Sequence, residues 1–128
     1  MNGEIKDKIL VAVYGSLRKN YWNHRLLEDS KFLGEFRTGE IFTMFSLGAY
    51  PGINLNGKHS ITCEIYEVNN RTFERLDQLE GYPHYYNRVQ IETPYGHAWI
   101  YYLERESNNY NIVESGDWNE YTNKNGKN

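Results

Sequence analysis

The 128-residue sequence contains a single cysteine, three prolines and no long apolar segment. Cys63 has no partner for an internal disulfide, which favours a protein of a reducing compartment. No apolar run approaches the roughly 18 residues that a membrane-spanning helix requires. The first residues also lack the charged start and apolar middle of a secretion signal. We therefore expect a cytoplasmic protein that has no membrane partner.

Clustered positive charge is missing as well. The chain has 14 Lys and Arg residues against 17 Asp and Glu residues, for a formal net charge of −3. Nucleic-acid-binding surfaces need concentrated Lys and Arg, so we expect no nucleic-acid partner. The histidines do not have the spacing of metal ligands, and one cysteine adds nothing to them, so we expect no metal site.

Aromatic residues are abundant, with 12 tyrosines and three tryptophans. Tyrosine combines apolar area with a polar tip, which suits both β-sheets and lined pockets. The length is typical of one domain. We divide the chain into a polar leader (1–8), a single domain (9–122) and a polar tail (123–128).

The segment around which the chain is organised is Ile9–Val13, followed by the loop Tyr14-Gly15-Ser16-Leu17. Five consecutive apolar residues predict a strand buried on both faces. Gly15 allows a sharp turn and a close approach to the main chain. Such a loop presents several N–H groups at one point, where an anion or a carbonyl oxygen can accept them. The alternative is an ordinary turn at the end of a strand.

Further along, residues 18–28 contain one short helix, with Asn23 as its N-cap and Leu26 and Leu27 docked on the core. Residues 31–47 read as a strand interrupted at Gly34 and Gly39, which indicates bulges or a curved sheet. The following segments predict a loop over 47–53, a hairpin turn at Asn56-Gly57 and an alternating strand over 60–68.

The strongest helical pattern covers residues 71–80, with Phe73, Leu76 and Leu79 on one face and Gly81 as the stop signal. Asn69 and Asn70 supply its cap. Later signals predict strands over 85–93 and 97–103 and a last short helix over 117–121. The fold class is α+β: a small mixed β-barrel with one main flanking helix and short helical turns.

Two carboxylates, Asp77 and Glu80, share the last turn of the predicted helix. The helix dipole disfavours negative charge there. With the tyrosines that follow (Tyr82, Tyr85 and Tyr86), this position is expected to raise a carboxyl pKa, as a general base working near neutral pH requires. The alternative is a solvated helix end with two carboxylates that have no catalytic role. Ser16 lacks the flanking glycines of a nucleophile elbow and the Lys of a phosphate loop.

Taken together, several short motifs resemble the γ-glutamylcyclotransferase-like family, and most closely its γ-glutamylamine cyclotransferase branch. The resemblance runs from about position 9 to position 121. The motifs are Val13-Tyr14-Gly15-Ser16-Leu17-Arg18, Asn23-His24-Arg25, Tyr50-Pro51, Leu76-Asp77-Gln78-Leu79-Glu80-Gly81-Tyr82, Tyr86-Asn87-Arg88 and Ser115-Gly116-Asp117-Trp118.

The resemblance implies a cofactor-free reaction on a small-molecule γ-glutamyl substrate. The α-amine of the γ-glutamyl group attacks its own γ-carbonyl, which gives 5-oxoproline and releases an amine or amino acid. Glu80 matches the catalytic glutamate of the family. Tyr14, Gly15, Ser16 and Leu17 match the substrate-binding loop.

Two further positions follow the helix in the family pattern. We expect Tyr86 to line the cavity and Arg88 to be structural. Strand alternation places Tyr102 on one face with Ala98 and Ile100, so Tyr102 is also expected to bind substrate. The alternatives to an enzyme are a non-catalytic small-molecule-binding protein on the same barrel and a structural interaction module. The sequence does not indicate an oligomeric state.

Overall fold

The computed structural model describes residues 8–124, which form two sheets, two α-helices and a 3-10 helix. The helices are η2 (Trp22–Leu27), α1 (Asn70–Glu80) and α2 (Trp118–Lys124). The strands are β1 (Ile9–Val13), β2 (Lys31–Arg37), β3 (Phe42–Ser46), β4 (Pro51–His59), β5 (Thr62–Val68), β6 (Asn87–Thr93) and β7 (Gly96–Tyr102). The α+β class is therefore confirmed. The N-terminal leader up to residue 7 and the tail from residue 125 lie outside the described part.

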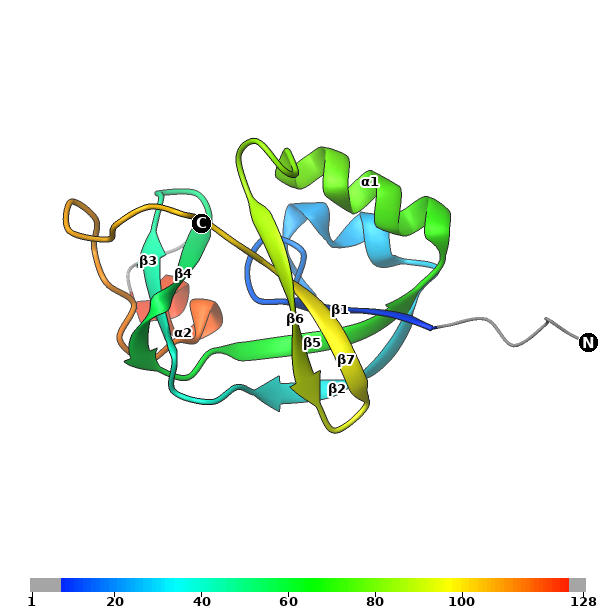
Figure 1. The fold of residues 1–128 in the computed structure, drawn as a ribbon, viewed down its shortest axis with the longest axis horizontal. Coiled ribbons are helices and arrows are strands. Elements are labelled where there is room, and N and C mark those ends of the chain that lie inside the picture. The colour runs from blue at the N-terminus through cyan, green and yellow to red at the C-terminus, as the bar shows by residue number, and fades with distance from the viewer. Residues whose placement is uncertain (1–7, 125–128) are drawn as a thin grey trace, which may run out of the picture.

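Strand β1 is the middle strand of a five-stranded sheet with the order β2-β5-β1-β7-β6. It pairs antiparallel with β5 and parallel with β7. Its side chains alternate between two core clusters, with Leu10 and Ala12 in one and Val11 and Val13 in the other. This strand has the predicted bounds and is buried on both faces. Figure 1 shows α1 and the shorter η2 on the same side of the sheet, above the end of β1.

The expected closed barrel is not present among the described strands. Strands β3 and β4 form a separate two-stranded sheet, and β2 and β6 remain the two edges of the larger one. A hydrogen bond from the Leu103 N–H to the Ile53 carbonyl (2.8 Å) ties the end of β7 to β4. The hairpin therefore packs at one end of the sheet, beside α2 (Figure 1), without closing it.

The hairpin turn predicted at Asn56-Gly57 is wrong. Strand β4 runs through these residues, and the chain reverses between β3 and β4 at residues 47–50. The pairing with β3 jumps between Phe42 and Thr43, so the Asn-Gly pair forms a bulge. Gly57 is needed there because a Cβ atom would collide with the backbone of Phe42 and the side chain of Thr43. Contacts between strands thus override a strong local turn signal.

Other local signals give mixed results. The bulge expected at Gly34 is confirmed by a register shift in the β2–β5 pairing. The single strand predicted over 31–47 is instead two strands, β2 and β3, and the loop predicted up to residue 53 ends where β4 begins at Pro51. Helix α2 runs to Lys124, two residues beyond the predicted domain end.

Helix α1 has the predicted termini to within one residue. The Asn69 side chain accepts a hydrogen bond from the Thr72 N–H (2.8 Å), and Gly81 ends the helix with φ of 67°. Leu76 is fully buried, but Leu79 is 42% exposed, so the predicted apolar face is narrower than its spacing suggested. Asn23 does not cap η2, since that helix follows Tyr21 without a side-chain cap.

A buried arginine connects the loop after β1 to the rest of the fold. Arg18 is 1% exposed. Its guanidinium forms ion pairs with Glu64 on β5 (3.1 Å), Asp117 before α2 (2.9 Å) and Glu35 on β2 (3.3 Å). Glu64 also accepts hydrogen bonds from the Lys19 N–H and the Tyr66 hydroxyl. This network fixes the end of the loop, because a buried charge without its partners is strongly unfavourable.

We expect Glu64→Gln to lower the free energy of unfolding by about 3 kcal/mol, because the variant leaves the Arg18 charge partly uncompensated in the core. The matched variant is Glu35→Gln, which alters the same arginine but at a side chain that is 63% exposed. A loss below about 1 kcal/mol is expected there. Urea unfolding measures both, and equal losses would contradict this account of the network.

Candidate active site

A cavity of about 180 Å³ lies between the end of β1 and the last turn of α1. It contains most of the site residues expected from the sequence: Tyr14, Gly15, Ser16, Leu17, Glu80 and Tyr86. Residues from other parts of the chain complete the lining: Ala12, Val13, Asn23, Tyr50, Pro51, Leu79, Tyr85 and Tyr101. The fold thus brings the loop after β1 and the end of α1 to one place, although they are more than 60 residues apart in the sequence.

The loop after β1 is held in a tight turn. The Arg18 N–H donates to the Gly15 carbonyl (2.9 Å), and Pro51 packs so closely on Gly15 that a Cβ atom there would lie 2.6 Å from the proline ring. The N–H groups of residues 15–17 donate to no other group within the described part of the chain. The loop therefore keeps three donors for a ligand.

Asn23 has a different role from the predicted one. Its amide donates to the Ser16 hydroxyl oxygen (2.9 Å), and its N–H donates to the Ser16 carbonyl (3.2 Å). Ser16 therefore accepts through its hydroxyl and retains its own proton for a group in the cavity.

Glu80 is half-buried, and its carboxylate makes no hydrogen bond or ion pair with any residue of the described range. Burial in the cavity wall raises the Glu80 pKa from its ordinary 4.5 to about 7, and the nearby Asp77 carboxylate adds to the effect. Removal of the carboxylate from water disfavours its charged form, and a like charge nearby does the same.

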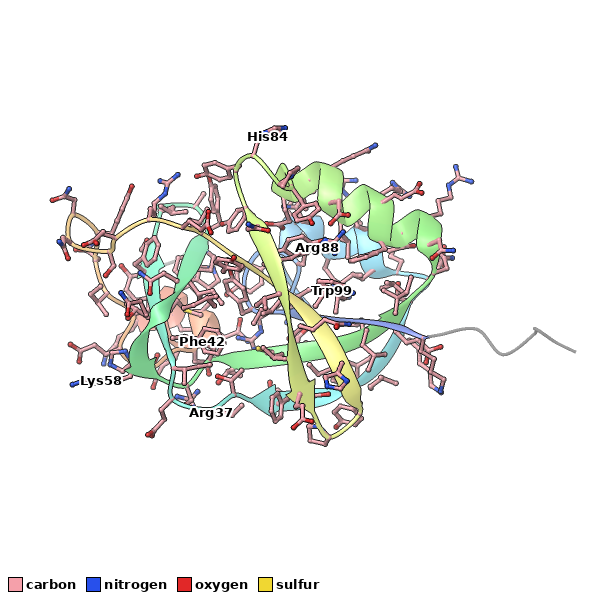
Figure 2. The ribbon with its side chains drawn as sticks, viewed as in Figure 1. Arg37, Phe42, Lys58, His84, Arg88 and Trp99 are labelled. Atoms are coloured by element: carbon pink, nitrogen blue, oxygen red, sulfur yellow. The ribbon has the colours of Figure 1, made fainter. Side chains whose placement is uncertain are left out.

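Asp77 is the structural member of the carboxylate pair. Its oxygens accept from Arg88 Nε (3.0 Å) and Nη2 (3.2 Å) and from the Tyr101 hydroxyl (2.6 Å). The Arg88 guanidinium is enclosed by aromatic rings, at 4.0 Å from Tyr82 and 4.4 Å from Trp99. Figure 2 shows Arg88 and Trp99 together beneath α1. The prediction that Arg88 is structural is therefore confirmed.

Three buried tyrosines form the wall around Glu80, and each uses its hydroxyl proton elsewhere. Tyr14 donates to the Tyr101 carbonyl (2.7 Å), Tyr86 to the Pro51 carbonyl (2.9 Å) and Tyr101 to Asp77. Burial raises the pKa of all three hydroxyls, and the Glu80 charge raises them further. These tyrosines therefore stay neutral and leave proton transfer to Glu80.

Two of the tyrosines considered in the sequence lie outside this cavity. Tyr102 shares a face of β7 with Ala98 and Ile100 as expected and packs with them on one core cluster, but it does not line the cavity. Its neighbour Tyr101 lines the cavity instead, because successive strand residues face opposite sides. Tyr82, which follows the two carboxylates in the sequence, stacks on the Arg88 guanidinium that binds Asp77. Tyr50 and Tyr101 also line the cavity. Neither the Tyr50-Pro51 turn nor the Tyr101-Tyr102 pair indicates in the sequence which ring faces inward, so these two residues are not predicted from it.

Other sequence features lie away from the cavity. His84 is exposed at the tip of the loop between α1 and β6 (Figure 2). Within residues 8–124 no three His, Cys, Asp or Glu side chains come close enough together to hold a metal ion. None of the described helices has the length and apolarity to cross a membrane. The cytoplasmic location stays a prediction.

Comparison with protein families agrees with this geometry. Residues 11–120 match the model of the family described as "Gamma-glutamyl cyclotransferase, AIG2-like". The chain belongs to this family. The predicted resemblance to the γ-glutamylcyclotransferase-like enzyme family is thereby confirmed.

Relatives and solved structures support the same assignment. A Vibrio cholerae protein named "Putative gamma-glutamylcyclotransferase" is 43% identical over 109 residues, which cover 85% of this chain and 94% of the relative. The crystal structure of an uncharacterized Pyrococcus horikoshii protein is 30% identical with a TM-score of 0.81, covering 91% of this chain and 95% of the other. An AIG2-like protein from Mus musculus is 25% identical with a TM-score of 0.75, covering 88% of this chain and 90% of the other.

The raised pKa of Glu80 predicts a pH-dependent stability effect. The folded protein binds the Glu80 proton more tightly than the unfolded chain, so ionisation opposes folding as the pH rises from 4.5 to about 7. Glu80→Gln should therefore increase the free energy of unfolding by about 2 kcal/mol at pH 8, and the gain should vanish near pH 4.5. Urea titrations across this range measure it.

Glu74→Gln is the control, since Glu74 is exposed on the same helix. It should show no pH-dependent gain. A Glu80→Gln gain that is constant with pH would contradict the burial of an unpaired carboxylate.

Proposed function

We propose that this protein is a γ-glutamyl cyclotransferase of the γ-glutamylamine type. It cyclises a γ-glutamyl group to 5-oxoproline and releases an amine or amino acid, with Glu80 as general acid and base. The observation that carries the proposal is the placement of an unpaired, half-buried carboxylate in one small cavity with the three uncommitted N–H groups of residues 15–17. Membership of the gamma-glutamyl cyclotransferase, AIG2-like family supports it.

The chemistry needs one base and one set of donors. The Glu80 carboxylate takes a proton from the substrate α-ammonium, and the freed amine nitrogen attacks the γ-carbonyl carbon to form the ring C–N bond. The carbonyl oxygen gains negative charge, which N–H donors of the loop stabilise. Glu80 then returns the proton to the leaving nitrogen as the original C–N bond breaks, and the extra proton of the ring nitrogen passes to the released amine, which becomes an ammonium. No water is consumed, and the ring closure benefits from holding both reacting atoms in one cavity.

The Glu80 pKa of about 7 suits both halves of this cycle. A group whose pKa lies near the working pH accepts a proton and gives it up again with little cost in either direction. An ordinary exposed glutamate, with a pKa of 4.5, would be a weak base toward an ammonium group.

The cavity fits the common part of such substrates. Its volume of about 180 Å³ is below the range of roughly 300–1,000 Å³ that holds a whole drug-sized ligand. A γ-glutamyl group therefore fills it, and the leaving group lies at the mouth. There the half-exposed Tyr50 and Tyr85 meet with their hydroxyl oxygens 3.3 Å apart.

The test is release of 5-oxoproline from γ-glutamyl-ε-lysine, γ-glutamyl-alanine and glutathione. We expect turnover of at least one of them by the unaltered protein. Glu80→Gln should lower kcat by about 10²- to 10⁴-fold, the range attributed to a general acid-base group. Glu74→Gln should keep full activity because its side chain is exposed away from the cavity.

Two outcomes would overturn the proposal. Unchanged turnover by a folded Glu80→Gln variant would remove Glu80 from the mechanism. Binding of these compounds without 5-oxoproline formation by the unaltered protein would favour a small-molecule-binding protein instead.

The pH dependence gives an independent test. Because Glu80 must be ionised to accept the ammonium proton, kcat/KM should rise with pH and level off above about 7. The residual activity of Glu80→Gln should lack this rising limb. A rise centred near pH 4.5 in the unaltered protein would show that an ordinary exposed carboxylate controls the reaction.

A further inference from the structure

Ser16 and Asn23 form a hydrogen-bonded pair in the wall of the Glu80 cavity, and both residues are half-buried. The Asn23 side-chain amide donates to the Ser16 hydroxyl oxygen (2.9 Å), and the Asn23 backbone N–H donates to the Ser16 carbonyl (3.2 Å). The backbone bond does not depend on the Asn23 side chain. A substitution of Asn23 therefore changes the hydroxyl contact and leaves the loop tied to η2.

The direction of the side-chain bond decides where the Ser16 proton can go. An amide NH₂ group donates and does not accept, so the Ser16 oxygen is the acceptor of this bond. The hydroxyl proton then lies on another side of the oxygen, and it donates to no group of residues 8–124. Because Ser16 lines the cavity, its proton is available to a ligand there.

The α-carboxylate of a γ-glutamyl group finds few other donors in this cavity. Among the described residues that line it, none is Lys or Arg. The proposed chemistry directs the loop N–H groups to the γ-carbonyl oxygen, and the Tyr50 and Tyr85 hydroxyls bond to each other at the mouth (3.3 Å). The remaining tyrosine hydroxyls of the lining donate to groups of the fold: Tyr14, Tyr86 and Tyr101. Ser16 thus keeps a hydroxyl proton for a carboxylate, and such charge-assisted bonds are strong.

We propose that the Ser16 hydroxyl donates to the α-carboxylate of the γ-glutamyl group, and that Asn23 is the positioning residue that holds this hydroxyl in the donating orientation. The inference rests on the proposed function and adds a requirement for the α-carboxylate, a group that takes no part in the bonds that form and break. Asn23 acts through Ser16 and does not itself touch the substrate.

Two substrates that differ only in this carboxylate test the contact. γ-Glutamyl-alanine carries it, whereas 4-aminobutanoyl-alanine lacks it but can close the same lactam ring, to 2-pyrrolidinone. Ser16→Ala should raise KM for γ-glutamyl-alanine by about tenfold, the effect of one charge-assisted hydrogen bond, and leave its kcat within about twofold. The reaction of 4-aminobutanoyl-alanine should stay within about twofold. A fall in kcat on both substrates would overturn the proposal, because it would place Ser16 at the carbonyl oxygen.

Substitutions of Asn23 test its positioning role. Asn23→Ala removes the amide and lets the hydroxyl rotate, so KM for γ-glutamyl-alanine should rise by about threefold to tenfold. Asn23→Asp replaces the amide donor with a carboxylate that accepts the Ser16 proton, so the rise should be at least about tenfold. The double variant of Ser16→Ala and Asn23→Ala should be no worse than Ser16→Ala alone. Additive losses would mean that Asn23 binds the substrate directly, and would overturn the positioning role.

Thr93→Val is the matched control. The Thr93 hydroxyl also bonds to main-chain groups, the Gly96 carbonyl (2.6 Å) and the Tyr95 N–H (3.1 Å), but in the turn after β6 and outside the cavity lining. It should leave both reactions unchanged. Ser16→Ala keeps the backbone bonds of the loop, so its comparison on the two substrates decides the contact even if an Asn23 variant does not fold. Equal kcat/KM for the two substrates in the unaltered protein would also overturn the contact.

Calorimetry on the Glu80→Gln variant separates this inference from the proposed function, since binding needs no turnover. That variant should bind γ-glutamyl-alanine about tenfold more tightly than 4-aminobutanoyl-alanine, and the added Ser16→Ala substitution should abolish the difference. This result would support the contact even if the unaltered protein formed no 5-oxoproline. Equal binding of both compounds would overturn the contact alone and leave the role of Glu80 unaffected.

Discussion

The site depends on a difference in bonding between two carboxylates in the last turn of α1. Arg88 and Tyr101 bind Asp77, while Glu80, three residues later, has no partner among the described residues. The Arg88 guanidinium is itself enclosed by Phe73, Tyr82 and Trp99. The Asp77 contact therefore anchors the end of the helix on the sheet and keeps a negative charge beside Glu80. Both effects favour a Glu80 that holds its proton to near neutral pH.

Different contacts hold the opposite wall of the cavity. The loop after β1 packs against Pro51 at Gly15 and is tied by the Arg18 ion pairs at its other end. The Pro51 carbonyl also accepts a hydrogen bond from the Tyr86 hydroxyl. Pro51, at the start of β4, therefore contacts both the loop after β1 and the tyrosines that line the cavity. Preorganised donors stabilise developing charge without reorganisation, which makes these contacts chemically useful.

Short patterns of neighbouring residues predicted three features of the fold correctly. The Ile9–Val13 strand, the Asn69 cap and the left-handed Gly81 stop all appear as expected. The Asn56-Gly57 turn failed because β4 continues through it against β3. The expected barrel does not close for a related reason, since β3 and β4 pair with each other and leave the edges of the larger sheet open. Strand pairing is decided by contacts between distant residues, which short patterns do not contain.

The sequence by itself determined the family, the α+β class, the glycine loop and the acidic helix end. Each of these depends on a short motif of adjacent residues or on residues at helical spacing. Only the tertiary structure decided that Tyr101 rather than Tyr102 lines the cavity with Glu80, and that Asn23 holds Ser16. The physical reason is that burial, and with it the pKa of Glu80, is created by side chains from β1, β4, α1 and β7 that meet only when the chain folds.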